Sequence, residues 1–130
     1  MQYLVCFDGS QVARDCLKWS IKQANAAEDH ICIVHSMMGG PNMPRRDFET
    51  AERNLKQARQ QVEKAHISCE ADLSVRGMEP GEDIVRYARE KDIDEIVIGV
   101  KRRSKVGKMF FGSTAQFVIL EAHCPVLTLK

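Results

Sequence analysis

The sequence predicts an α/β fold with one doubly wound parallel sheet of five strands and helices on both faces. Short apolar runs alternate with segments of helical periodicity along all 130 residues, which is typical of this class. The apolar runs are continuous rather than alternating, as expected for strands buried on both sides. The segments between them are long enough for the crossovers that parallel strands need. Residues 1–130 are therefore expected to form a single domain.

Five apolar runs are predicted strands, because each is short and bounded by turn residues or polar segments. They are Tyr3–Phe7, Ile31–His35, Cys69–Val75, Glu95–Ile98 and Val126–Leu129. Right-handed crossovers between them favour the Rossmann-like strand order 3-2-1-4-5.

Four segments between these strands carry apolar residues at three- and four-residue spacing, which predicts helices. Ser10 is a suitable N-cap for the first helix. Pro80 suits the start of the third, since proline is least costly in a first turn. The predicted helices extend from Ser10 to about Ala27, from Asp47 to Lys64, onward from Pro80, and from Ser113 to about Ala122.

The composition excludes several classes of protein. With 19 basic and 18 acidic residues the formal net charge is +1, which argues against a dedicated nucleic-acid binder. No apolar run approaches the roughly 20 residues of a membrane span. The N-terminal run is predicted to be a core strand rather than a signal peptide, so a cytoplasmic location is expected.

The cysteine pattern predicts neither a disulfide framework nor a metal site. The count of five is odd, and no two cysteines form a C-x-x-C pair. These thiols are expected to be reduced, mostly buried, and to pack as small apolar groups.

Three segments are candidates for a ligand site, because open α/β sheets bind ligands beyond the carboxyl ends of their strands. They are Asp8-Gly9-Ser10 after the first strand, Ser36–Pro44 after the second, and Gly99–Ser113 after the fourth. If the first and fourth strands are neighbours, the first and third segments face each other across the crevice.

The third segment has the composition of a polyphosphate site. Five of the eight residues from Lys101 to Lys108 are basic. Gly112-Ser113-Thr114 then opens a helix, whose N-terminal N–H groups attract phosphate, and a glycine permits close approach of the backbone. The alternative is a solvated loop followed by a well-capped helix.

The chain resembles a universal stress protein over its whole length. That family has a first strand that ends in aspartate, here Asp8, and a nucleotide motif of Gly, two residues, Gly, nine residues, Gly, then Ser or Thr. The motif aligns with Gly99, Arg102, Gly112 and Ser113, so that arginine replaces the second glycine. Arg102 then either pairs with a phosphate or crowds the pocket and favours AMP, ADP or no ligand.

The resemblance implies a role for each site residue in binding ATP, ADP or AMP, with or without Mg²⁺. Asp8 would accept hydrogen bonds from the ribose or lie near the adenine, and Ser36 would line the adenine pocket with its backbone. The floor and the phosphate end would be formed by the remaining site residues, which are Ile98, Gly99, Lys101, Arg102, Gly112, Ser113 and Thr114.

The expected function is regulatory nucleotide binding with little or no hydrolysis. The alternatives are a dimeric interaction module without nucleotide, or a weak ATPase. A Walker P-loop is excluded because Met109 follows Gly107-Lys108. A receiver domain is disfavoured because the third strand does not end in aspartate. His35, the histidine nearest the rim, is expected to be a structural residue with satisfied hydrogen bonds.

The last strand predicts a homodimer. Val126, Leu127, Thr128 and Leu129 should form an edge strand, and an apolar edge is a pairing surface. The resemblance implies that this strand pairs with its twin. A further hypothesis is a ligand-dependent switch: nucleotide would order the segment from Val100 to Phe111, whose basic residues repel one another without a ligand, into a surface that another protein reads.

Overall fold

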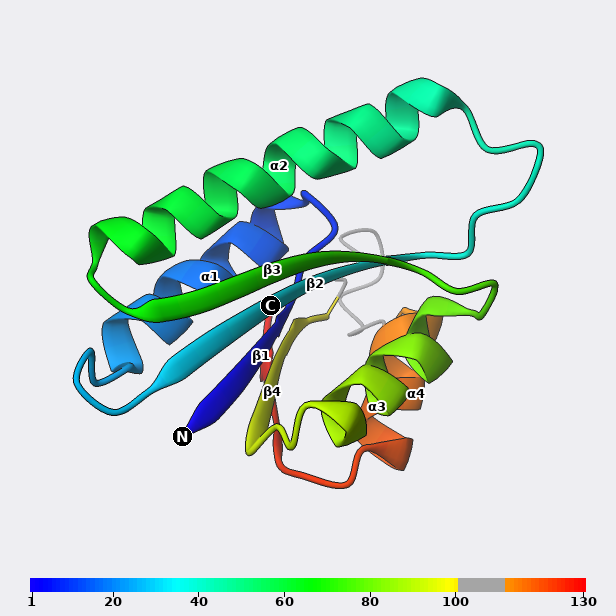
Figure 1. Ribbon diagram of the computed structural model, residues 1–130. Helices are drawn as coiled ribbons and strands as arrows, with labels where there is room; N and C mark the ends of the chain where they lie inside the picture. The colour runs from blue at the N-terminus through cyan, green and yellow to red at the C-terminus, as the bar shows by residue number, and fades with distance from the viewer. Residues whose placement is uncertain (101–111) are drawn as a thin grey trace.

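The computed structural model describes residues 1–100 and 112–130 and contains a five-stranded parallel sheet in the order β3-β2-β1-β4-β5 (Figure 1). The predicted fold class and strand order are confirmed. The strands are β1 Gln2–Cys6, β2 His30–Met37, β3 Ser68–Val75, β4 Glu95–Gly99 and β5 Val126–Leu129. The sheet winds in opposite directions from its centre, since β1 pairs with β2 on one side and with β4 on the other.

Two pairs of helices cover the two faces of the sheet (Figure 1). They are α1 Gln11–Gln23, α2 Arg45–Lys64, α3 Pro80–Glu90 and α4 Ser113–Glu121. Because alternate strand residues point to opposite faces, β1 contributes Val5 to the core under α1 and α2. Its neighbour Leu4 enters the second core, under α3 and α4.

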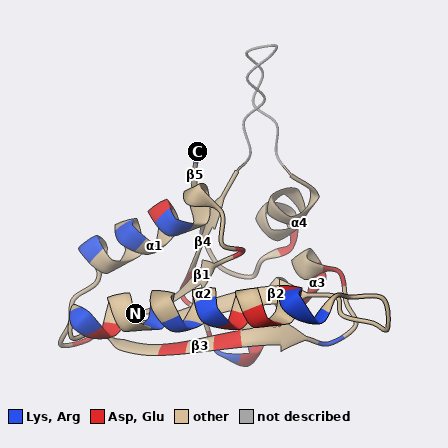
Figure 2. Cartoon of the chain, turned by 90° about the horizontal axis from the view of Figure 1, so that it is seen from above, with Lys and Arg blue, Asp and Glu red and all other residues tan. Residues whose placement is uncertain are grey.

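Helix α2 is long and strongly amphipathic. Its buried residues are Ala51, Leu55, Ala58 and Val62, and its other faces carry charges of both signs (Figure 2). The prediction of a solvated outer face is consistent with this pattern. Among the helices of residues 1–100 and 112–130, none is both long and apolar enough to cross a membrane.

Helix α1 is shorter than predicted. It ends at Gln23, and its C-cap Ala24 already has an extended backbone with ψ of 140°. The backbone N–H of Asn25 donates to Asp29 Oδ2 at 2.7 Å, and the Asn25 side chain accepts the N–H of Ala27 at 2.9 Å. These local side-chain contacts favour a turn over another helical turn, so the expected end at Ala27 was wrong.

Candidate functional site

A cavity of about 250 Å³ lies at the carboxyl ends of β1, β2 and β4. This is the point where the winding of the sheet reverses, and there the loops after β1 and β4 diverge toward opposite faces. The lining is apolar on the sheet side, with polar groups at the rim. The described lining residues are Cys6, Phe7, Asp8, Ser10, Val12, Ala13, Val34, His35, Ser36, Pro80, Ile84, Ile98, Gly99, Gly112, Ser113, Thr114 and Ala115.

Seven of the nine residues predicted for the nucleotide site lie around this one cavity. They come from four different loops or strand ends that the topology brings together, and they are Asp8, Ser36, Ile98, Gly99, Gly112, Ser113 and Thr114. Lys101 and Arg102 lie outside the described residues, as does the rest of the basic segment up to Phe111.

The turn after β1 holds Asp8 at the rim. Asp8 Oδ1 accepts the backbone N–H of Ser10 at 2.9 Å, which fixes the carboxylate over the start of α1. Gly9 has a φ of +82°, a conformation that glycine adopts without strain. Ser10 then caps α1, since its Oγ accepts the N–H of Ala13 at 3.3 Å. The exposed Asp8 carboxylate therefore faces the cavity as a fixed acceptor.

The N-terminus of α4 forms the opposite wall. Its N-cap is Gly112, which has no side chain that could accept a hydrogen bond from the first turn. The first intrahelical bond runs from Gln116 N–H to the carbonyl of Gly112 at 3.0 Å. The N–H groups of Ser113, Thr114 and Ala115 precede that bond, and all three residues line the cavity. Such a helix end favours a bound anion.

Gly99 ends β4, and Val12 of α1 packs closely against it. A Cβ atom at this position would lie 2.6 Å from Val12 Cγ1 and 2.7 Å from Val12 Cγ2. Both residues line the cavity. Because Gly99 has no side chain, α1 can pack against the end of β4 here, and no side chain from this position enters the cavity.

An ionic network centred on the buried Asp83 holds Ser36 in the cavity wall, and the sequence pattern did not predict it. Asp83, in the first turn of α3, is only 1% exposed. It accepts the Ser36 hydroxyl at 2.5 Å and the Arg76 Nε–H at 2.7 Å. The spacing along α3 could have indicated that Asp83 is buried, because Asp83 and the buried Tyr87 are four residues apart and so lie on the same helix face.

The electrostatics of Asp83 favour its charged form. Burial alone would raise its pKa, but hydrogen bonds from Ser36, Ser74 and Arg76, together with the charge of Arg76, outweigh burial and lower the pKa below 3.8. Arg76 also pairs with Glu90 at 2.6 Å. Asp83 is thus ionised, and its carboxylate fixes the position of the Ser36 side chain through a hydrogen bond.

His35 also lines the cavity, and the prediction of satisfied hydrogen bonds was wrong in one respect. Its Nδ1 is buried and has no hydrogen-bond partner among the described residues. Burial lowers the pKa of His35 from its ordinary value of 6.5, while the negative charge of Asp8 acts in the opposite direction. His35 therefore combines a place in the cavity wall with a buried, unsatisfied ring nitrogen, and burial favours its neutral form.

We expect His35 to titrate below pH 6.5 in the folded protein and lower still in Asp8→Asn, because the variant removes the charge that favours the protonated ring. NMR of the imidazole C–H signals across pH measures both values. Since the unfolded chain binds this proton more readily, His35 makes the free energy of unfolding fall as pH drops below 6.5. A pKa at or above 6.5, or no change in Asp8→Asn, would contradict this account.

A family model, curated sequences and solved structures all match this chain to the same family over nearly its whole length. The model of the universal stress protein family matches residues 1–130. A universal stress protein of Thermus aquaticus is 30% identical, over 98% of this chain and 96% of its own length.

Two solved structures of universal stress proteins from Archaeoglobus fulgidus are similar throughout. One is 37% identical with a TM-score of 0.90, and the match covers 100% of this chain and 98% of that one. The other, in complex with dAMP, is 34% identical with a TM-score of 0.84 and the same coverage.

Proposed function

Since the chain belongs to the universal stress protein family, we propose that the cavity between Asp8, Ser36 and Ser113 binds an adenine nucleotide. The observation that carries this proposal is the pairing of an apolar, strand-end cavity with the N-terminus of α4. One of its solved relatives, at 34% identity, is a complex with dAMP.

The two ends of the cavity suit different parts of a nucleotide. The apolar side, which includes Val34 and Ile98, accommodates a base. The Asp8 carboxylate accepts hydrogen bonds from ribose hydroxyls. The N–H groups of Ser113 and Thr114, with their hydroxyls, hold the phosphates. The sequence also predicts that Lys101 and Arg102 flank these phosphates.

The test combines identification of bound nucleotide with calorimetry. The natively purified chain is denatured and any released nucleotide is identified by chromatography. The emptied chain is then titrated with ATP, ADP and AMP, with and without Mg²⁺, and with GTP as a control for the base. We expect binding of at least one adenine nucleotide with a Kd below about 1 mM, which is about −4 kcal/mol. Absence of binding by all three would leave a nucleotide-free interaction module as the function.

We assign the chain a regulatory binding role, in which a protein partner reads the nucleotide-bound state, with little or no hydrolysis. Within the described lining, Asp8 is the one acidic residue, and its Oδ1 already accepts the Ser10 N–H. Incubation with ATP and assay of free phosphate tests this assignment. Sustained phosphate release that scales with protein concentration would identify a weak ATPase instead.

We also propose a homodimer that forms along β5. This strand pairs only with β4 within the described sheet, so its other edge is open to a second copy. Helix α4 precedes it and carries exposed apolar residues, which are Phe117, Ile119 and Leu120. An open strand edge and exposed apolar side chains are both features of surfaces that pair between subunits.

The Thr128→Pro variant is expected to be monomeric. The carbonyls of Pro125 and Leu129 face β4, where they accept the N–H groups of Ile96 and Val100. Because strand residues alternate in direction, the N–H of Thr128 faces the open edge, and proline removes that donor while leaving the β4 pairing intact. Sedimentation velocity at micromolar concentration measures the change. Thr128→Val, which keeps the N–H, is the control and should stay dimeric, whereas a dimeric Thr128→Pro would contradict the proposed seam.

A further inference from the structure

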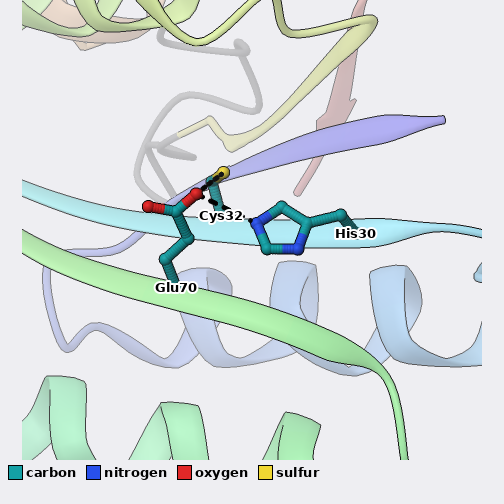
Figure 3. A group of neighbouring side chains, drawn as sticks. All are labelled: His30, Cys32 and Glu70. Atoms are coloured by element: carbon teal, nitrogen blue, oxygen red, sulfur yellow. Dashed lines mark hydrogen bonds and ion pairs between the residues drawn. The ribbon is translucent and has the colours of Figure 1, made fainter.

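Three side chains of metal-ligating types gather on β2 and β3 (Figure 3), and none of them lines the nucleotide cavity. His30 and Cys32 lie on the same face of β2, two residues apart. Glu70 on β3 is the register partner of Cys32. The spacing of the cysteines along the chain predicted no metal site, but the pairing of two parallel strands assembles one set of ligands from residues 38 to 40 positions apart.

The three ligand atoms are close enough to share one ion. His30 Nε2 lies 3.1 Å from Glu70 Oε1, Cys32 Sγ lies 3.9 Å from the same oxygen, and the three atoms are within 4.8 Å of one another. Zinc bond lengths of about 2.0 Å to nitrogen and oxygen and about 2.3 Å to sulfur place tetrahedral ligands roughly 3.3–3.6 Å apart. Side-chain shifts of about 1 Å therefore suffice.

Neighbouring groups hold two of these side chains in place. Ser68 Oγ lies 2.7 Å from His30 Nδ1, so with the proton on Nδ1 the serine accepts it and Nε2 keeps its lone pair. Lys91 donates to Glu70 Oε2 at 3.0 Å, which leaves Oε1 on the side of the histidine and the thiol. Both contacts are of the kind that orients ligands around a metal.

The charges and the accessibility also suit a divalent cation. Burial raises the pKa of the Cys32 thiol to about 12, so its proton leaves only when a metal binds the sulfur. The Cys32 thiolate formed in this way and the Glu70 carboxylate would neutralise two positive charges, and the nearby Asp72 balances Lys91. Cys32 is fully buried, while the side chains of His30 and Glu70 are 24% and 41% exposed. An ion can thus enter from solvent, and its fourth position remains open to water.

We propose that His30, Cys32 and Glu70 form a site for a zinc-class divalent cation that ties the edge strand β3 to β2. The mixture of thiolate, imidazole and carboxylate selects Zn²⁺ over Mg²⁺ or Ca²⁺, which prefer oxygen ligands. On binding, the Cys32 S–H bond breaks, a sulfur–metal bond forms and the proton passes to the buffer. The metal binds His30 in the tautomer that carries its proton on Nδ1.

Cobalt titration tests this site directly, because Zn²⁺ itself has no absorption bands from its filled d shell. The untagged full-length chain is stripped with a chelator and titrated with Co²⁺ alone, and Zn²⁺ competition then gives the relative affinity. We expect one equivalent to produce a thiolate-to-cobalt charge-transfer band and the visible bands of a tetrahedral ion. Added Zn²⁺ should remove both. Absence of the charge-transfer band at one equivalent would overturn the proposal.

Variants identify the ligands. Cys32→Ala should abolish the charge-transfer band, and Glu70→Gln, at a half-exposed position, should weaken Co²⁺ binding at least about tenfold. Ser68→Ala should weaken it by about tenfold through loss of the His30 contact. Cys16→Ala is the matched control, since Cys16 is equally buried but lies in the core on the other face of the sheet.

The same variants can refute the site. If the band persists in Cys32→Ala, or disappears in Cys16→Ala or Cys69→Ala, another thiol is the ligand. If Cys32→Ala does not fold, Glu70→Gln decides the question, because a folded Glu70→Gln chain with unchanged Co²⁺ affinity would overturn the proposal.

Discussion

Replacement of Asp83 by alanine is expected to lower the free energy of unfolding by about 2–3 kcal/mol, a large part of the stability of a domain of this size. The reason is that Asp83 is 1% exposed and holds both Ser36 and Arg76. Its removal leaves the Ser36 hydroxyl without its acceptor and Arg76 without its buried partner. Urea unfolding followed by circular dichroism measures the loss.

The control for this prediction is Glu82→Ala, which removes the neighbouring acidic residue from the same helix turn. Glu82 is exposed, so we expect a loss of less than about 1 kcal/mol. Because the pKa of Asp83 is lowered on folding, its contribution is present above pH 3.8 and is lost as pH falls through the folded-state pKa. The free energies of unfolding of the wild-type chain and of Asp83→Asn should therefore become more similar as the pH falls below 3.8. A loss below about 1 kcal/mol in Asp83→Ala at pH 7 would contradict the role of this network.

The Ser113→Asp variant is expected to weaken nucleotide binding by about 100-fold or more while the fold persists. The new carboxylate would lie at the first position of α4, where the proposed phosphates bind. Two unit charges about 4 Å apart repel by about 4 kcal/mol at an effective dielectric constant of 20, and each 1.4 kcal/mol is a factor of ten in Kd. Acidic residues stabilise helix N-termini, so the thermal midpoint should be unchanged or slightly higher.

Gln11→Asp is the matched control for Ser113→Asp. Gln11 is the first residue of α1, so the variant adds the same charge at the equivalent helix position. Gln11 lines a separate cavity with Phe7 and Arg14, and it is not among the residues of the candidate site. Calorimetry with the same nucleotide should show unchanged affinity. Equal effects of the two substitutions would indicate general repulsion rather than a phosphate site at α4.

The sheet and the rim of the cavity could be predicted from the sequence because they follow from local patterns. Continuous apolar runs between helical segments require buried parallel strands, and the crossover rule orders those strands. The positions after the strands then bring Asp8, Ser36, Gly99 and Ser113 to one edge. The end of α1 was harder to predict, since it depends on side-chain contacts of Asn25 with its own neighbours.

Features that depend on pairing between distant strands and helices could not be predicted in the same way. Asp83 resembles an ordinary first-turn acid until α3 packs on the sheet and places it against Arg76 and Ser36. Likewise, Glu70 meets Cys32 only through the β2–β3 register, which a single apolar pattern does not specify residue by residue. Predicting either contact requires the three-dimensional arrangement of the strands and helices, because the spacing of residues along the sequence does not specify it.

The central claim, that an adenine nucleotide occupies the cavity at the carboxyl ends of β1, β2 and β4, is tested most directly by NMR titration of the isotope-labelled chain with AMP and ATP. We expect saturable backbone amide shifts at Asp8, Ser36 and Ser113–Ala115, which are among the residues that line this cavity. Amides of Lys18, Gln57 and Gln61, which line the other cavity near α1 and α2, should stay unchanged. Shifts confined to those residues, or no saturable shifts at millimolar nucleotide, would contradict it.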